Sequence, residues 1–163
     1  EMDKAMSTQL YDVLDVVGHR FQEVFSQLFG GGTAQIVLTD PDNILTGGID
    51  FYIQPPGKKR QQLTLLSGGE RALTVIALLF SFLDYRPAPF CVLDEVDAAL
   101  DEANVERFSS YLNRVNKETQ FIVVSHRKKT MEAAEVLQGV TMVERGVSRL
   151  LTVAFEDVKE DLA

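Results

Sequence analysis

The sequence has 163 residues but only one cysteine, and it has no long apolar run. Cys91 has no partner for an intramolecular disulfide, which excludes a disulfide-stapled fold and fits a reducing compartment. The longest apolar run, residues 72–83, is interrupted by Thr74 and Ser81. It falls short of the about 20 residues that a membrane-spanning helix needs. We therefore expect neither a membrane anchor nor a signal peptide.

Positive charge is also scarce, since the formal net charge is −8. The chain as a whole therefore lacks the basic field that non-specific nucleic-acid binding requires, and any DNA contact must be local or made by other parts. Apolar residues make up 45% of the chain and charged residues 25%. This composition and length predict one soluble globular domain with a buried core.

The N-terminal third predicts a long helix followed by a small β structure. Apolar residues recur at spacings of three and four from Leu10 to Leu28, which predicts an amphipathic helix from about Asp3 to Phe29, ended by three glycines. This helix is either a docked surface helix or the stub of a coiled coil, and the charged start of the sequence favours a fragment of a longer protein. The runs AQIVLT and GIDFYI then predict a hairpin or small sheet.

Helices and strands alternate in the rest of the chain. Helices are predicted over residues 69–84, 102–116 and 129–137, and strands at FCVL, FIVV, GVTMVE and RLLTVAF. Near-continuous apolar strands separated by helices indicate a mostly parallel sheet buried on both faces. Ligands bind such sheets at the carboxyl ends of the strands, so we expect the chemistry just after Leu93 and Val124. The tail EDVKEDLA is expected to fray.

Polar residues stand at both of these places. Asp94 and Glu95 follow the strand FCVL, and Ser125 and His126 follow FIVV. An apolar strand that ends in Asp-Glu resembles a Walker B element, in which one carboxylate holds Mg²⁺ and the next accepts a proton. The alternative is that acidic residues only end a strand and cap the following turn.

The stretch LSGGE precedes the apolar helix that starts near residue 69. Ser67 and Glu70 match a capping box, in which each side chain bonds the other residue's backbone N–H. Gly68 and Gly69 are less favourable in a helix than alanine by about 0.5–1 kcal/mol each. Glycines at a helix N-terminus suit an anion that must approach unpaired N–H groups at the positive end of the dipole, so they predict phosphate binding.

Four elements occur in the order and spacing of ATP-binding-cassette (ABC) ATPases. LSGGE resembles the signature motif, FCVLDE the Walker B strand, AALD the D-loop and VSHR the histidine switch. Asp94 lies 27 residues after Ser67, and His126 lies 32 residues after Asp94. Val96 and Asp97 stand where transporters usually have proline and Thr or Ser. Over nearly its whole length the chain resembles the C-terminal half of the ATPase head of a structural maintenance of chromosomes (SMC) protein, bacterial chromosome-segregation type.

A complete ABC ATPase also has a G-x-x-x-x-G-K-[ST] phosphate loop, and this sequence has none. Its only Gly-Lys pair is Gly57-Lys58, with Tyr52 and Lys59 at the flanking positions. The resemblance implies that the N-terminal half of the same head supplies the loop. It further implies an α/β ABC-type P-loop ATPase head, with residues 1–29 as the coiled-coil neck helix and residues 30–163 as the C-terminal lobe. That lobe would hold a mostly parallel sheet flanked by helices and a small N-terminal β-hairpin region.

The resemblance implies three catalytic roles on one head. Asp94 binds Mg²⁺, Glu95 is the general base that orients the lytic water, and His126 hydrogen-bonds the γ-phosphate of ATP. Cofactor and substrate are therefore Mg²⁺ and ATP. The presence of Glu95 argues against an adaptor that keeps the fold without turnover.

The resemblance implies further roles for residues at an interface between two heads. Ser67, Gly68 and Gly69 contact the γ-phosphate of ATP held by the opposite head, and Asp101 couples the two sites. ATP joins two heads, most simply identical ones, and hydrolysis frees them. The implied partners are the N-terminal half, a second SMC head, a kleisin subunit and, through the full complex, DNA, with no membrane. The implied function is chromosome condensation and segregation by a cytoplasmic, nucleoid-associated protein that entraps DNA.

Several interpretations stay open. The basic clusters at residues 58–60 and 127–129 are either solvated surface or contacts to DNA or a partner. Arg71 either supports the trans site or solvates its helix. The alternatives in function are the nucleotide-binding subunit of a membrane transporter and a DNA double-strand-break repair ATPase of the same split-head architecture.

Overall fold

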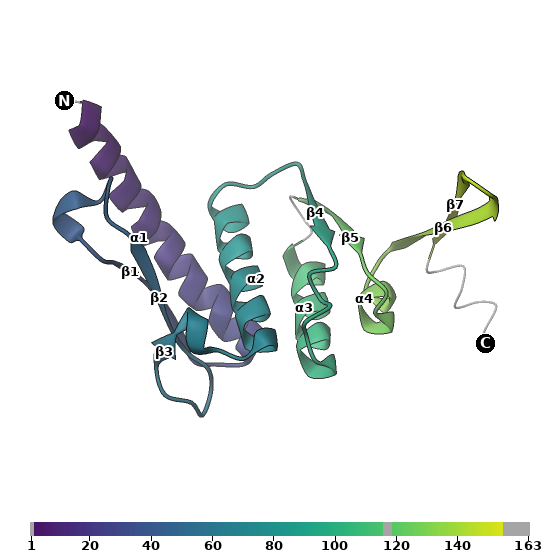
Figure 1. Ribbon diagram of the computed structural model, residues 1–163, viewed down its shortest axis with the longest axis horizontal. Helices are drawn as coiled ribbons and strands as arrows, with labels where there is room; N and C mark the ends of the chain where they lie inside the picture. Colours follow the sequence, from purple (N-terminus) through teal and green to yellow (C-terminus); the bar gives the residue numbers. More distant parts are fainter. Residues whose placement is uncertain (1, 116–118, 155–163) are drawn as a thin grey trace.

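The computed structural model describes residues 2–115 and 119–154. In chain order its elements are α1 (Met2–Phe29), β1 (Thr33–Leu38), η1 (Pro41–Asn43), β2 (Ile49–Gln54), β3 (Gln61–Gln62), η2 (Leu63–Leu65), α2 (Gly68–Tyr85), β4 (Phe90–Asp94), α3 (Glu102–Val115), β5 (Gln120–Val124), α4 (Lys128–Glu132), β6 (Val136–Glu144) and β7 (Val147–Ala154). The molecule is elongated, with α1 and the first sheet at one end, α2 and α3 in the middle and the β6–β7 hairpin at the other end (Figure 1).

The predicted long N-terminal helix is confirmed as α1. Its apolar stripe is buried from Val17 onward, where Phe21 and Phe25 are both 0% exposed, and Leu10 and Leu14 are half-buried. Phe21 makes edge contacts with Phe25 and with Phe51 of β2, which fixes the helix on the first sheet. The helix ends at Phe29, and Gly30 follows it with φ 71°, a conformation that favours glycine. A Cβ at Gly32 would lie 2.3 Å from the carbonyl oxygen of Gln54, so only glycine fits there.

The two predicted β-rich runs pair with each other. β1 and β2 are antiparallel, with register from Thr33 opposite Gln54 to Leu38 opposite Ile49, and the short β3 extends this sheet beside β2. Ala34 and Ile53 form one buried pair in the register and belong to the same core as α1. Residues 30–62 therefore form a small sheet that one face of α1 covers.

The helices α2 and α3 pack around an aromatic cluster. Phe80 of α2 packs against Phe108 and Tyr111 of α3, at centroid distances of 6.3 and 4.9 Å, and makes an edge contact with Phe121 of β5. Burial, with the charge of Asp84 added, raises the pKa of Tyr111 to about 12. This core joins the middle helices to the strands that end at the candidate site.

Two expectations about the later elements are wrong. In the described part of the chain only β4 and β5 pair in parallel, and β6 and β7 form a separate antiparallel hairpin, so the sheet is not mostly parallel. The helix predicted over 129–137 ends at Glu132, and β6 starts at Val136. The β-branched run that follows gains a ladder with β7, which outweighs local helical periodicity. Residue 116, Phe155 and the tail EDVKEDLA lie outside the described residues.

The expectation that the parallel pair is buried on both faces is also wrong. Leu93 faces the core and is 3% exposed, but Phe90, Val92, Ile122 and Val124 are between 47 and 58% exposed. Because side chains alternate along a strand, one whole face of the β4–β5 pair is open.

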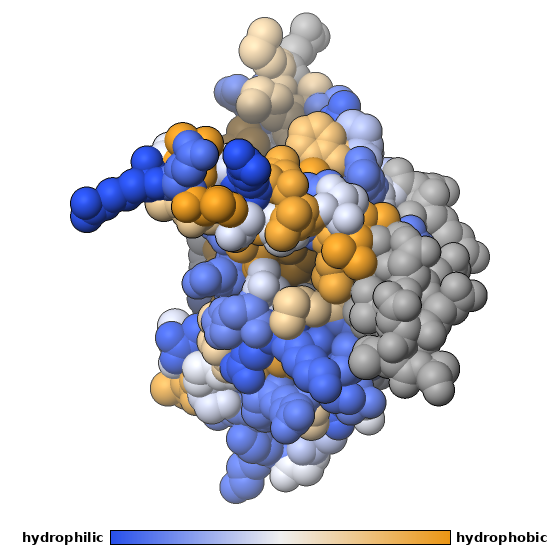
Figure 2. Space-filling model, turned by 90° about the vertical axis from the view of Figure 1, so that its right-hand side faces the viewer, coloured by the Kyte–Doolittle hydropathy of each residue, from blue (hydrophilic) through white to orange (hydrophobic). Residues whose placement is uncertain are grey.

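The β6–β7 hairpin is more exposed still. Neighbouring residues point to opposite faces of a strand, and both Leu150 and Leu151 of β7 are more than half exposed, as are Val140, Met142 and Val143 of β6. In the view onto the end of the molecule where the hairpin lies, hydrophobic side chains gather in the upper half and hydrophilic ones below (Figure 2). No helix in the described residues is long and apolar enough to cross a membrane.

Candidate functional site

Strands β4 and β5 end together, as the sequence predicts. Asp94 pairs with Val124 in the parallel register, and the backbone N–H of Glu95 donates to the carbonyl of Val124 at 3.0 Å. Glu95 and Ser125 therefore leave the sheet at the same edge. The side chains of Asp94, Glu95 and His126 are exposed there. The edge thus presents two carboxylates and an imidazole to the surroundings.

Glu95 adopts an uncommon backbone conformation. Its φ is 47°, and it is the one non-glycine residue with positive φ in the ranges the structure describes. A left-handed conformation at a residue with a Cβ costs about 1–2 kcal/mol. Hydrogen bonds hold the bend, because Glu95 N donates to Val124 and Glu95 O accepts from the N–H of Ala98 at 3.0 Å. The bend takes Glu95 out of the alternation of β4, so adjacent carboxylates are free to serve different roles.

The carboxylate of Asp94 fits Mg²⁺ in one particular way. Within the described residues no group of three or more His, Cys, Asp or Glu side chains could hold a metal ion. Mg²⁺ commonly binds one or two carboxylates and completes its octahedron with waters and substrate phosphates. The exposed Asp94 therefore fits an ion that arrives with a phosphate ligand, and not an ion caged by the protein alone.

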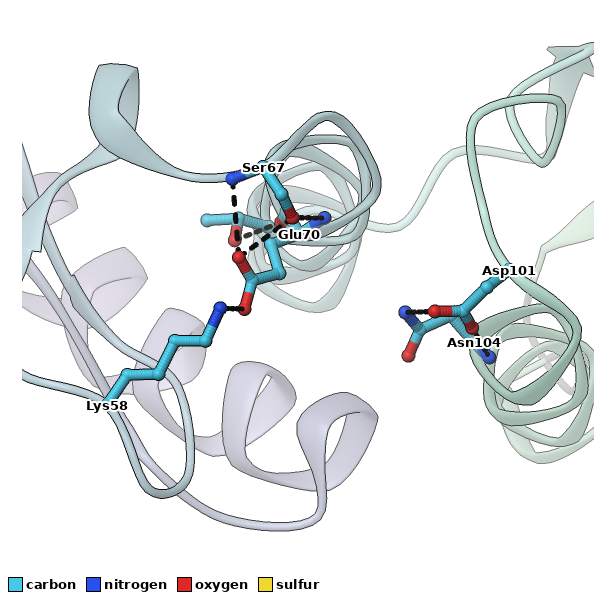
Figure 3. A network of polar contacts seen from close by, with 6 residues as sticks. Lys58, Ser67, Glu70, Asp101 and Asn104 are labelled. Atoms are coloured by element: carbon cyan, nitrogen blue, oxygen red, sulfur yellow. Dashed lines mark hydrogen bonds and ion pairs between the residues drawn. The ribbon is translucent and has the colours of Figure 1, made fainter.

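The N-terminus of α2 carries the predicted capping box. Ser67 Oγ accepts the backbone N–H of Glu70 at 3.4 Å and donates to Glu70 Oε2 at 2.8 Å, and the N–H of Ser67 donates to the same oxygen at 3.3 Å. Lys58, from the loop between β2 and β3, pairs with Glu70 Oε1 at 2.9 Å (Figure 3). Burial would raise the pKa of Glu70, but hydrogen bonds from Lys58 and Ser67 outweigh it and lower the pKa.

The two glycines of this tip differ in what surrounds them. A Cβ at Gly69 would lie 3.1 Å from the carbonyl oxygen of Ala99, so Gly69 lets the loop after β4 approach the helix closely. A Cβ at Gly68 would meet nothing within 4 Å. Contact within the chain accounts for Gly69, whereas Gly68 faces open space. The phosphate interpretation therefore depends on Gly68 more than on Gly69.

Asp101 directly precedes α3, the next helix along the chain. The backbone N–H of Asn104 donates to Asp101 Oδ1 at 2.8 Å, and the amide of Asn104 donates to Asp101 Oδ2 at 3.3 Å (Figure 3). These bonds satisfy the first turn of α3. The role of Asp101 across a head–head interface stays a prediction.

Besides Lys58, three more basic side chains whose role the sequence left open have partners within the chain. Arg71 donates to two carbonyl oxygens of the segment before α2, at 3.1 and 3.2 Å, so it supports the tip. Lys128 and Lys129 each lie 3.7 Å from a carboxylate oxygen of Glu132. These exposed pairs contribute little stability.

Sequence reasoning missed Asp97, which is 0% exposed. Its Oδ2 accepts the hydroxyls of Ser125 at 2.6 Å and Thr130 at 2.5 Å. Ser125 Oγ also accepts the backbone N–H of Arg127 at 2.9 Å, and the guanidinium of Arg127 donates to two carbonyls of the loop 98–101. The one signal in the sequence was that Asp97 stands where transporters usually have Thr or Ser.

Comparison with known proteins gives a consistent family. The family model described as RecF/RecN/SMC N terminal domain matches residues 8–149. The chain is similar to the chromosome partition protein Smc of Bacillus subtilis (strain 168), with 58% identity over 160 residues, and to that of Lactiplantibacillus plantarum, with 53% identity over 161 residues. These matches cover 98% and 99% of the chain, but the chain spans 14% of the length of either relative.

Solved structures have the same fold. One is the Smc head domain of Pyrococcus furiosus with an extended coiled coil, bound to the C-terminal domain of ScpA, with TM-score 0.87 and 34% identity over 98% of this chain and 40% of that one. Another comes from work on ATP-driven dimerization and DNA stimulated activation of SMC ATPases, with TM-score 0.85 and 34% identity over 96% of this chain and 94% of that one.

Proposed function

The chain belongs to the RecF/RecN/SMC N terminal domain family, with the α/β fold of an SMC ATPase head, and on this premise we propose that it is the C-terminal half of such a head. Residues 1–29 would be the neck helix and residues 30–163 the lobe. Two features support the proposal: the sequence has no phosphate loop, and one apolar face of β4–β5 is open. The N-terminal half would supply the loop and cover that face.

ATP is the proposed substrate. The observation that carries the proposed hydrolysis is that β4 and β5 end together and present Asp94, Glu95 and His126 at one edge. Asp94 would hold Mg²⁺, which when bound neutralises charge on the phosphates. Glu95 accepts a proton from the attacking water and orients it, and His126 donates a hydrogen bond to a γ-phosphate oxygen. The left-handed bend at Glu95 lets neighbouring carboxylates take the metal and the proton separately.

The tip of α2 is proposed to act on a second head. Ser67, Gly68 and Gly69 would contact the γ-phosphate of ATP held opposite, and Asp101 would lie at the interface. The open space at Gly68 and the exposed position of Ser67 support this role. Because these contacts need the γ-phosphate, ATP joins the heads and hydrolysis frees them.

The biological role follows from the relatives. Those at 53–58% identity are chromosome partition proteins, which favours chromosome condensation and segregation over a transporter subunit or a repair ATPase. The head bound to ScpA supports a kleisin partner for this chain, and the work on SMC dimerization supports a second, identical head. The assembled protein would entrap DNA at the nucleoid in the cytoplasm.

One experiment tests the trans arrangement. The chain is mixed with a companion segment that carries the phosphate loop, and phosphate release per head is measured as the head concentration is raised. We expect slow turnover whose total rate rises more steeply than linearly with head concentration, so that the rate per head also increases, because each site needs two heads. Specific activity that stays constant down to dilute monomer contradicts the arrangement.

A further inference from the structure

Asp97 joins the two loops that carry the candidate catalytic groups. We propose that Asp97 is a positioning residue that fixes His126 relative to Glu95 by tying the loop after β5 to the loop after β4. The inference rests on the proposed function of His126 and Glu95. Asp97 itself is fully buried, so it acts through its neighbours and does not touch substrate.

The first step of the argument is the cost of burying this carboxylate. A buried charge is expensive unless it is hydrogen-bonded, and here one oxygen accepts two hydroxyls. The other oxygen, Oδ1, has no hydrogen-bond partner within the described part of the chain, and neither has the buried Nε of Arg127. A neutral Thr or Ser would avoid this cost. The acceptor strength of a carboxylate toward two hydroxyls is the gain that offsets it.

The second step is where those bonds fall along the chain. His126 has an anchored residue on each side: Ser125 donates to Asp97, and Arg127 donates to the carbonyls of Ala98 at 3.2 Å and Leu100 at 2.8 Å. The imidazole itself is exposed. Its position is therefore set by its neighbours and not by packing of the ring.

The third step connects this anchor to Glu95. Asp97 sits in the turn that starts at Glu95, where the N–H of Ala98 donates to the carbonyl of Glu95 at 3.0 Å. Asp97, which lies inside this turn, accepts the hydroxyl of Ser125, the residue before His126. A displacement of either loop moves the general base and the histidine relative to each other.

The chain contains a matched control. Thr130 donates to the same oxygen of Asp97 from α4, yet it lies four residues beyond His126 and does not flank it. Thr130→Val and Ser125→Ala each remove one hydroxyl from one buried carboxylate, and Ser125→Ala also removes the acceptor of the Arg127 backbone N–H. Asp97→Ala removes the carboxylate and leaves that acceptor in place. A positioning role of Asp97 therefore predicts that Asp97→Ala and Ser125→Ala both act on His126 far more strongly than Thr130→Val does.

The test uses the head assembled from this chain and the segment with the phosphate loop, with ¹³C-labelled histidine in this chain only. The chain has two histidines, so His19 on α1 is an internal reference for His126. We expect Asp97→Ala and Ser125→Ala to shift or broaden the His126 imidazole signals and leave those of His19 unchanged, and Thr130→Val to leave both unchanged. Asp97→Asn keeps an acceptor oxygen and should restore most of the wild-type His126 signal.

Kinetics on the same samples give the second readout. Ser125→Ala and Asp97→Ala should lower kcat about tenfold or more, since small displacements of catalytic groups are costly. The KM for ATP should change less than twofold, about the resolution of such measurements. Asp97→Asn should retain more activity than Asp97→Ala, since the asparagine keeps an acceptor oxygen. This holds even if Asp97→Asn lowers Tm because the buried amide N–H groups have no acceptor.

The outcomes separate the two proposals. Unchanged His126 signals in Asp97→Ala and Ser125→Ala, or equal effects of Ser125→Ala and Thr130→Val, overturn the positioning role. A wild-type head that binds ATP and shows no turnover contradicts the proposed function, and the histidine signals still decide the role of Asp97.

Discussion

Two polar clusters of this molecule are built in opposite ways. The tip cluster, Lys58, Ser67 and Glu70, joins residues close in sequence and leaves Ser67 exposed. The switch cluster, Asp97, Ser125, Arg127 and Thr130, joins residues up to 33 positions apart around a fully buried carboxylate.

The two clusters have different structural effects: the tip cluster shapes a surface, and the switch cluster fixes the interior. Local bonds at the tip shape a helix end that faces outward, which suits contact with another molecule. Long-range bonds in the switch cluster hold two loops of the same chain in one geometry, which suits catalysis on that chain. Substitutions in the tip cluster should therefore change dimerisation, and substitutions around the switch cluster should change turnover.

The largest effect is expected at the edge that the switch cluster organises. Glu95→Gln keeps the size of the side chain but removes its proton acceptor, so turnover by the assembled head should fall at least about 100-fold. ATP should still join the heads, and light scattering should show a stable nucleotide-bound dimer. A variant that stays monomeric with ATP and turns over normally shows that Glu95 has another role.

The next effect is expected at the tip. Ser67→Arg puts a long side chain in the space where the γ-phosphate of the opposite head would approach, and this steric clash should weaken ATP-dependent dimerisation at least about tenfold, or about 1.4 kcal/mol. Nucleotide binding by the single head should persist. Ser67→Ala controls for the lost cap, which costs about 1 kcal/mol. Loss of nucleotide binding in the Ser67→Arg head places Ser67 in cis.

The two glycines separate packing within the chain from contact outside it. Gly69→Ala brings a Cβ to 3.1 Å from the carbonyl oxygen of Ala99 and should lower the free energy of unfolding by about 1 kcal/mol. Gly68→Ala meets no atom within 4 Å and should leave that free energy unchanged or raise it by up to about 1 kcal/mol. Thermal unfolding measures both. Gly68→Ala should nevertheless weaken ATP-dependent dimerisation, and an unchanged dimer contradicts phosphate contact at Gly68.

The smallest effect concerns pH and the pair of Lys58 and Glu70. The pKa of Glu70 is lowered on folding from its ordinary 4.5, so its carboxylate stabilises the fold above that value and the gain is lost as pH falls through the lowered pKa. Lys58→Met should reduce stability at neutral pH by about 0.2–1 kcal/mol, since Lys58 is half exposed. The difference from wild type should shrink below about pH 4.5 in denaturant titrations. A difference that is constant with pH rules out the ion pair as its cause.

Much of the fold was readable from short-range patterns. The periodicity of α1, the capping box at Ser67 and the strands that end at Asp94 and Val124 depend on residues within one or two turns of each other, and the structure confirms all three. The predicted helix over residues 129–137 was wrong. The helix α4 has only five residues, because the apolar residues that follow it pair with β7 as a strand.

The sequence by itself determined which residues begin helices and end strands, because capping and periodicity act over a few residues. Only the tertiary structure decided that Gly69 meets Ala99, that Asp97 receives hydroxyls from beyond β5, and that one face of β4–β5 stays uncovered. Those outcomes depend on contacts between residues far apart in the chain, whose pairing no local pattern encodes.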